Sequence, residues 1–192
     1  MKEFYKDIER ISGYLEEKQA DFDAAMRISM SIVRQAGQAI TYLHNNDMRS
    51  AARETASMKK SVKKLMAMDA LFRYNTQQAY QEYSEAIIFA SIKSGSGVPS
   101  VKSLNVDNEA YLLGLLDVVG ELKREVLECL REGRLDDAVR YFDTMKEIYD
   151  GTRKLRFAEA VLRGFRKKQD TARIQIENAG SEILMFKSGR QP

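Results

Sequence analysis

Cysteine and histidine are nearly absent from this chain of 192 residues, which contains one of each, Cys129 and His44. A single cysteine cannot form an intrachain disulfide, so a reducing cytoplasm is the expected compartment. A zinc site of cysteine and histidine ligands cannot be assembled within one chain. A ribonuclease mechanism that uses two histidines is excluded in the same way. If the protein is an enzyme, its carboxylates are the expected reagents, holding a hard cation such as Mg²⁺ or Mn²⁺.

Proline is also scarce, because only Pro99 and Pro192 occur, and little therefore interrupts long helices. No apolar run approaches the roughly 20 residues of a membrane helix, so we expect no membrane association. Apolar residues make up 44% and charged residues 31% of the chain, which is typical of a folded, soluble protein. The length suits one domain, which we place at residues 1–187, with a loose tail at 188–192.

Apolar residues recur with helical spacing along the chain, and no segment alternates with the period of two that is typical of a β-strand. The predicted fold class is therefore all-α, a bundle of about six to seven long helices. Asp47 is the expected N-cap of the second helix. Gly133 is expected to end the helix that covers residues 107–131. The expected helices cover residues 3–45, 47–66, 69–93, 107–131, 135–151 and 155–186, with a loop at 93–106.

Positive charge is concentrated in two regions, residues 47–75 and 153–173, although the formal net charge is only +3. A local excess of lysine and arginine is what contact with a phosphate backbone requires, and an ordinary solvated surface is the alternative. The candidate substrate-binding residues of the first region are Lys59, Lys60, Lys63, Lys64 and Arg73.

Two of the expected helices each carry a pair of carboxylates. The motif YLLGLLDVVGELKRE places Asp117 and Glu121 four residues apart, and hence on one helical face. In QEYSEAIIF, Glu82 and Glu85 share a face at the start of a helix that continues as apolar all round and is expected in the core. If these helices pack face to face, four carboxylates converge, and a divalent cation would relieve their repulsion.

An ordinary amphipathic helix is the alternative explanation for Asp117 and Glu121, because the apolar residues of this helix lie on its opposite side. Gly114 and Gly120 argue mildly against that alternative, since each costs about 1 kcal/mol in a helix interior relative to alanine. Glycine is tolerated at such a position when another group packs or binds closely against the backbone.

The two acidic motifs together resemble the translin/Trax family, and specifically its Trax branch. QEYSEAIIF is similar to the Trax motif QEYxEAxxF, and VDNEAYLLGLLDVVGELKRE is similar to VDYLLGxxDLxGELMR. MKEIYDG and KKQDTARIQIENAGSEI resemble later segments of the same family, so the resemblance spans roughly residues 70–185.

The resemblance implies a translin-like fold and a metal-dependent endoribonuclease, since Trax is the catalytic subunit of a ribonuclease that it forms with translin. It implies that Arg124 contacts a substrate phosphate. The implied partners are single-stranded or duplex RNA, single-stranded DNA as a further ligand, and copies of the chain itself, up to a closed octamer. The implied catalytic and Mg²⁺- or Mn²⁺-binding residues are Glu82, Glu85, Asp117 and Glu121.

Other functions were weighed on the same residues. A non-catalytic RNA- or DNA-binding ring, as translin alone forms, predicts binding without cleavage, and the four carboxylates argue against it. A ferritin-like di-iron bundle needs two Glu-x-x-His motifs, which one histidine cannot supply. A purely structural helical scaffold is the remaining alternative. We expect His44 to cap a helix rather than bind a ligand, and Cys129 to serve packing.

Overall fold

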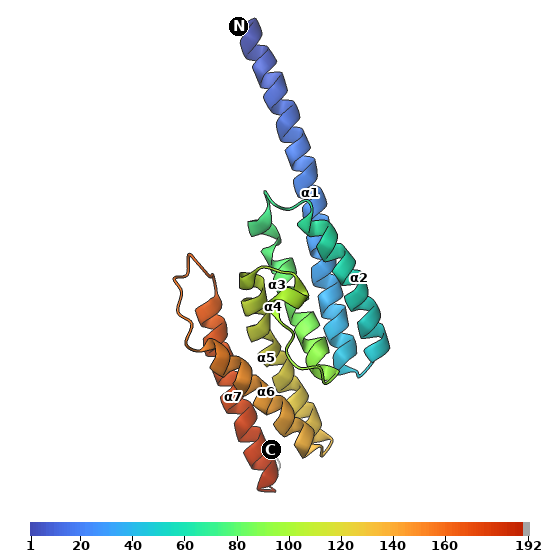
Figure 1. Ribbon diagram of the computed structural model, residues 1–192, viewed down its shortest axis with the longest axis vertical. Helices are drawn as coiled ribbons and strands as arrows, with labels where there is room; N and C mark the ends of the chain where they lie inside the picture. Colours follow the sequence, from blue (N-terminus) through green and yellow to red (C-terminus); the bar gives the residue numbers. More distant parts are fainter. Residues whose placement is uncertain (190–192) are drawn as a thin grey trace.

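The computed structural model describes residues 1–189, which form seven helices and no strand (Figure 1). This confirms the predicted all-α class. No described helix is long and apolar enough to cross a membrane. Of the expected tail, residues 190–192 lie outside the described residues. The helices are α1 (Lys2–His44), α2 (Met48–Met66), α3 (Arg73–Lys93), α4 (Val101–Leu104), α5 (Asn108–Arg131), α6 (Leu135–Thr152) and α7 (Phe165–Lys187).

The expected helix ends are confirmed where a specific residue stops or starts a helix. The Asp47 carboxylate accepts a hydrogen bond from the Ser50 backbone N–H at 3.0 Å and so caps α2. Gly133 follows α5 with a φ of 74°, a left-handed conformation that glycine adopts without steric cost. The loop at 93–106 differs from expectation only by the single turn of α4.

The third helix begins later than the sequence predicts, at Arg73 instead of residue 69. Asp69 is buried in the turn that precedes it and accepts hydrogen bonds from Thr76 Oγ1 at 2.5 Å and Tyr80 Oη at 2.8 Å. These bonds tie the segment before α3 to the first two turns of the helix. Asp69 therefore lies outside α3 and is not its first residue.

The last helix also begins later, at Phe165 instead of residue 155. Residues 153–164 form an irregular connection that ends at Gly164 with a φ of 77°. Within it, the Arg163 guanidinium donates a hydrogen bond to Tyr74 Oη at 2.7 Å, which ties the connection to the start of α3. A positive φ breaks helical geometry, so one continuous helix over 155–186 was a wrong prediction.

The helices α3 and α5 lie side by side at the centre of the bundle, with α1 and α2 on one side and α6 and α7 on the other (Figure 1). A Cβ atom on Gly114 of α5 would lie 2.6 Å from the carbonyl oxygen of Gln81 and 2.9 Å from the backbone nitrogen of Glu85. Only glycine permits this approach. The expected close contact at Gly114 is thereby confirmed, and it sets the two acidic motifs against each other.

The first half of α1 has no such support, because it projects beyond the rest of the bundle (Figure 1). Residues 1–21 are all exposed, and burial begins with the half-buried Phe22, whose ring meets the edge of Phe72. The helix itself is unbroken from Lys2 to His44, and its second half packs on α2 and α3.

Candidate active site

The crossing of α3 and α5 buries Glu85 beside other carboxylates. The Glu85 side chain is 8% exposed, and no cationic side chain forms an ion pair with it among the described residues. Burial, reinforced by the negative charges of Asp117, Glu82 and Glu121, raises the pKa of Glu85 to about 9. Burial raises the pKa of Glu82 as well, and Asp117 adds to that shift. The two acidic pairs therefore lie within electrostatic reach of each other across the crossing of α3 and α5.

Asp117 does not lie on a solvent-facing side of α5, because it is half-buried between α3 and α7. One carboxylate oxygen accepts a hydrogen bond from Gln81 Nε2 at 2.7 Å. The other forms an ion pair with Lys168 Nζ of α7. Lys168 belongs to the second basic region of the sequence, and it is the residue of that region that reaches the acidic site.

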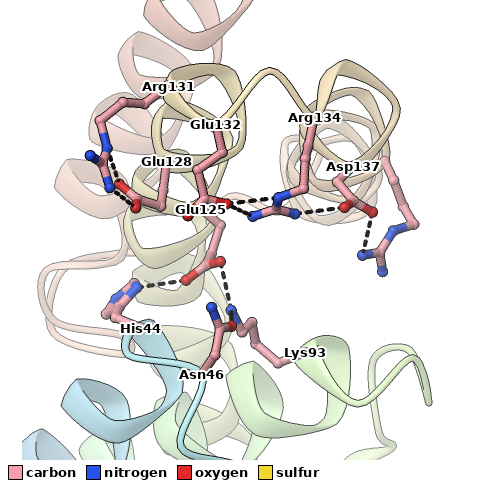
Figure 2. Close-up of polar contacts among 10 residues, drawn as sticks. His44, Asn46, Lys93, Glu125, Glu128, Arg131, Glu132, Arg134 and Asp137 are labelled. Atoms are coloured by element: carbon pink, nitrogen blue, oxygen red, sulfur yellow. Dashed lines mark hydrogen bonds and ion pairs between the residues drawn. The ribbon is translucent and has the colours of Figure 1, made fainter.

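Glu121 contacts His44, which is the last residue of α1. His44 Nε2 lies 2.5 Å from Glu121 Oε2. His44 Nδ1 lies 2.7 Å from Oε1 of Glu125, one turn further along α5, and Figure 2 shows this second contact. With a carboxylate on each ring nitrogen, the imidazole fits the doubly protonated, cationic form. Burial opposes that charge, but the hydrogen bonds to Glu121 and Glu125 outweigh it and raise the pKa of His44.

Glu125 completes a buried ionic network below the acidic site. Its second oxygen accepts from Lys93 Nζ at 2.7 Å, and Lys93 also donates to Asn46 Oδ1 at 2.9 Å (Figure 2). Burial would raise the pKa of Glu125, but the bonds from His44 and Lys93 outweigh it and lower that pKa. The network joins α1, α3 and α5 at one point. Both ring nitrogens of His44 contact carboxylates of α5, so its side chain does not cap α1 and the predicted capping role is wrong.

Sequence reasoning missed five residues of this site. One signal was available, since Glu125 continues the spacing of four from Asp117 and Glu121 on the same face of α5. Lys168 lies in the second basic region, but no spacing singles it out there, and none marks the other three, because their partners lie on different helices. The missed residues are His44, Gln81, Lys93, Glu125 and Lys168. Cys129 is fully buried, which confirms its expected packing role.

The four carboxylates fit a hard cation in their chemistry but are not arranged as a ready ligand set. Within residues 1–189, no three His, Cys, Asp or Glu side chains lie together in a way that would hold a metal ion. Asp117 and Glu121 instead direct oxygens at Lys168 and His44. The donor set nevertheless consists of oxygens alone, and a cation would relieve the repulsion that contributes to the raised pKa of Glu85.

The candidate substrate-binding residues are not gathered at the carboxylates. Arg124 is exposed on α5, one turn beyond Glu121. Arg73 forms an ion pair with Asp107 at 2.8 Å and stacks over the Tyr80 ring at 3.7 Å, contacts that support the fold. The remaining candidates are exposed on α2, which packs mainly against α1 at the flank of the bundle: Lys59, Lys60, Lys63 and Lys64.

Comparison with known proteins extends the likeness over nearly the whole chain. The sequence profile described as the Translin family matches residues 8–180. The protein MJ0175 of Methanocaldococcus jannaschii is 29% identical over 186 residues, which cover 94% of this chain and 82% of that protein. The profile match includes the first helices, where the motifs alone showed no specific resemblance.

Solved structures share the fold as well. The structure of AfC3PO in complex with duplex RNA superposes with a TM-score of 0.90 at 28% identity, covering 95% of this chain and 97% of that one. A second structure, described as the crystal structure of AfC3PO, gives a TM-score of 0.88 at 28% identity, with 95% of this chain and 98% of that chain covered. The fold of apo-NeC3PO is also similar, with a TM-score of 0.82 at 21% identity and 92% and 96% covered.

Proposed function

The chain belongs to the Translin family, and from this premise we propose that it is a metal-dependent endoribonuclease of the Trax-like branch. The observation that carries the proposal is Glu85, a buried carboxyl group set against three other carboxylates without a cation of its own. Such an arrangement costs folding stability, and proteins keep strongly shifted groups of this kind chiefly at functional sites.

Glu82, Glu85, Asp117 and Glu121 would hold the cation, which we take to be Mg²⁺ or Mn²⁺ because the ligands are carboxylate oxygens. Bound there, a divalent cation supplies Lewis-acid polarisation of a phosphate and lowers the pKa of water. Gln81 and His44 orient Asp117 and Glu121 through the hydrogen bonds described above. They act on the reaction by fixing those two carboxylates.

Lys168 is the cation that α7 contributes to this site. Its ammonium group forms an ion pair with Asp117 and would also neutralise a substrate phosphate bound beside that carboxylate. Arg124, exposed one turn away from Glu121, would contact the RNA backbone beside the site. These roles require positive charge and no base-specific contact.

RNA is the proposed substrate, because AfC3PO, which shares this fold, has been solved with duplex RNA. Contacts through lysine and arginine to phosphates are independent of sequence, so binding should weaken steeply as salt rises. A non-catalytic ring that binds RNA or single-stranded DNA is the alternative within the same family. We further propose that the chain works as a homo-oligomer, up to an octamer.

Cleavage of labelled single-stranded and duplex RNA, with Mg²⁺ or with EDTA, tests the proposal. Asp117→Asn is compared with the wild type and with Asp136→Asn, which removes an exposed charge from α6. We expect metal-dependent cleavage that falls at least about 100-fold in Asp117→Asn only, while RNA binding survives. Binding without cleavage under any metal would favour the ring alternative. Neither binding nor cleavage would leave a structural scaffold.

A further inference from the structure

The projecting half of α1 carries an exposed apolar stripe that no other helix covers (Figure 1). Phe4, Ile8, Ile11 and Leu15 are 55%, 47%, 46% and 53% exposed and follow one another at helical spacings of four, three and four. The stripe continues directly into the face of α1 that is buried further along, beginning with Phe22. An isolated helix gains little stability on its own, so this face is built for packing.

A matching groove lies between α6 and α7. It has a volume of about 820 Å³. Val139, Phe142 and Tyr149 line it from α6, and Ile176 and Leu184 line it from α7. Gly180 also lines it, and an added Cβ there would lie 3.3 Å from the Phe142 ring, so glycine lets this ring pack closely against α7. Leu184 is 69% exposed, and within the described residues no other helix covers this groove.

We propose that the stripe of α1 docks into the groove between α6 and α7 of a second copy of this chain. Among the α6 residues that line the groove, those at positions 139, 142, 146 and 149 advance by three, four and three. Alternating spacings of three and four are those of one helix face, so the stripe and this side of the groove both run along a helix and can lie against each other. At 1.5 Å per residue, the stripe is about 16 Å long and the α6 side of the groove about 15 Å long.

The projecting half of α1 cannot reach the groove of its own chain. Because α1 is one unbroken helix whose second half is fixed against α2 and α3, its first half points away from the bundle and cannot turn back to α6 and α7 (Figure 1). The groove edge carries both signs of charge, including Asp143, Lys146 and Arg173. The stripe is likewise bordered by Asp7 and Lys18. Mixed charge on both sides permits pairing and gives no net repulsion.

Docking of this kind is head to tail, because each copy offers a stripe to one neighbour and a groove to another. Such contacts close into a ring or extend as a chain. The contact concerns assembly alone, and it would hold or fail independently of any RNA cleavage.

Four single variants test the docking in the absence of RNA and metal. Ile8→Glu breaks the stripe, and Gly13→Glu places the same charge on the opposite face of α1, where an added Cβ meets nothing within 4 Å. Leu184→Glu breaks the groove, and Met185→Glu, 47% exposed in the wild type and outside the groove lining, is its control. All replaced positions are exposed, so circular dichroism should show unchanged helix content.

Light scattering after size exclusion should give a lower mass for Ile8→Glu and for Leu184→Glu, and the wild-type mass for both controls. Mixing tagged Ile8→Glu with untagged Leu184→Glu should restore association, because the pair retains one intact groove and one intact stripe. Capture on the tag should then retain about tenfold more untagged protein than when both chains carry the same substitution, a difference of about 1.4 kcal/mol.

Three outcomes would overturn the proposal. A wild-type mass for Leu184→Glu would mean that the stripe docks elsewhere, such as on the stripe of another copy. A mixture that stays dissociated would exclude the head-to-tail contact. A monomeric wild type would exclude docking altogether.

Discussion

Glu85 of α3 and Glu125 of α5 are both almost completely buried, at 8% and 3% exposed, yet their pKa values move in opposite directions. Burial alone would raise both. Around Glu125, His44 and Lys93 supply two hydrogen-bonded cations, and these overcome the cost of burial. Around Glu85, the nearest charged groups are chiefly other carboxylates, which add to that cost.

The difference separates a structural carboxylate from a candidate functional one. Glu125 is a satisfied ion that joins three helices, and its removal should damage the fold. Glu85 is a group whose charged form the protein does not stabilise, and its removal should damage only a function that brings a cation to the site. Each of the following experiments tests that separation, from the largest expected effect to the smallest.

Glu125→Gln should lower the free energy of unfolding by about 3 kcal/mol at neutral pH, because it leaves the buried ammonium of Lys93 without its counter-charge. Urea denaturation measures the loss. Glu147→Gln, at an exposed position of α6, should change stability by less than about 0.5 kcal/mol. A loss below about 1 kcal/mol in Glu125→Gln would mean that the network contributes little to the fold.

Gly114→Ala should cost about 2 kcal/mol, because the added methyl group meets the backbone of α3 and must push the two acidic motifs apart. Gly120→Ala is the matched substitution on the same helix. There the new Cβ meets only the flexible Gln175 side chain at 3.1 Å, and the gain in helix propensity should offset the contact. Equal stability of the two variants, measured by urea denaturation, would contradict the close α3–α5 crossing.

Glu85→Gln should not destabilise the metal-free protein. The difference between its free energy of unfolding and that of the wild type should grow in favour of the variant as pH rises. The ordinary pKa of glutamate is 4.5 and that of folded Glu85 is about 9, so between these values the folded state retains a proton that the unfolded state releases. Wild-type stability therefore falls as pH rises across this window, by at most about 1.4 kcal/mol per pH unit.

The urea concentration at the unfolding midpoint, measured for both proteins from pH 5 to pH 9, gives this difference in stability. The contribution of Glu125 to stability depends on pH in the opposite direction. Its lowered pKa stabilises the fold above pH 4.5, and this stabilisation is lost as pH falls through the pKa of Glu125 in the folded state. A constant difference between wild type and Glu85→Gln would show that Glu85 titrates normally.

Mg²⁺ should stabilise the wild type at pH 8 by about 1 kcal/mol at a concentration five times its Kd. The effect should be much smaller in Glu85→Gln, because the cation then meets one fewer carboxylate. Thermal unfolding with Mg²⁺ or with EDTA measures it. Equal stabilisation of both proteins would place the bound cation away from Glu85.

Local patterns were enough to predict most of the fold. The helical spacing of apolar residues, the Asp47 cap and Gly133 depend on neighbours within a few residues, and each appears in the structure as expected. The late starts of α3 and α7 could not be read in this way. They depend on Asp69 bonding to side chains one and two turns away in α3, and on a connection tied to Tyr74.

The sequence by itself determined the all-α class and the two carboxylate pairs, because both follow from the 3.6-residue period of a helix. It also pointed to Gly114 as a place of close approach. Only the tertiary structure decided which carboxylates are neutralised. His44, Lys93 and Lys168 lie 77, 32 and 51 residues from the carboxylates that they contact. Charge acts through space, and no spacing along one helix shows which cation another helix will bring.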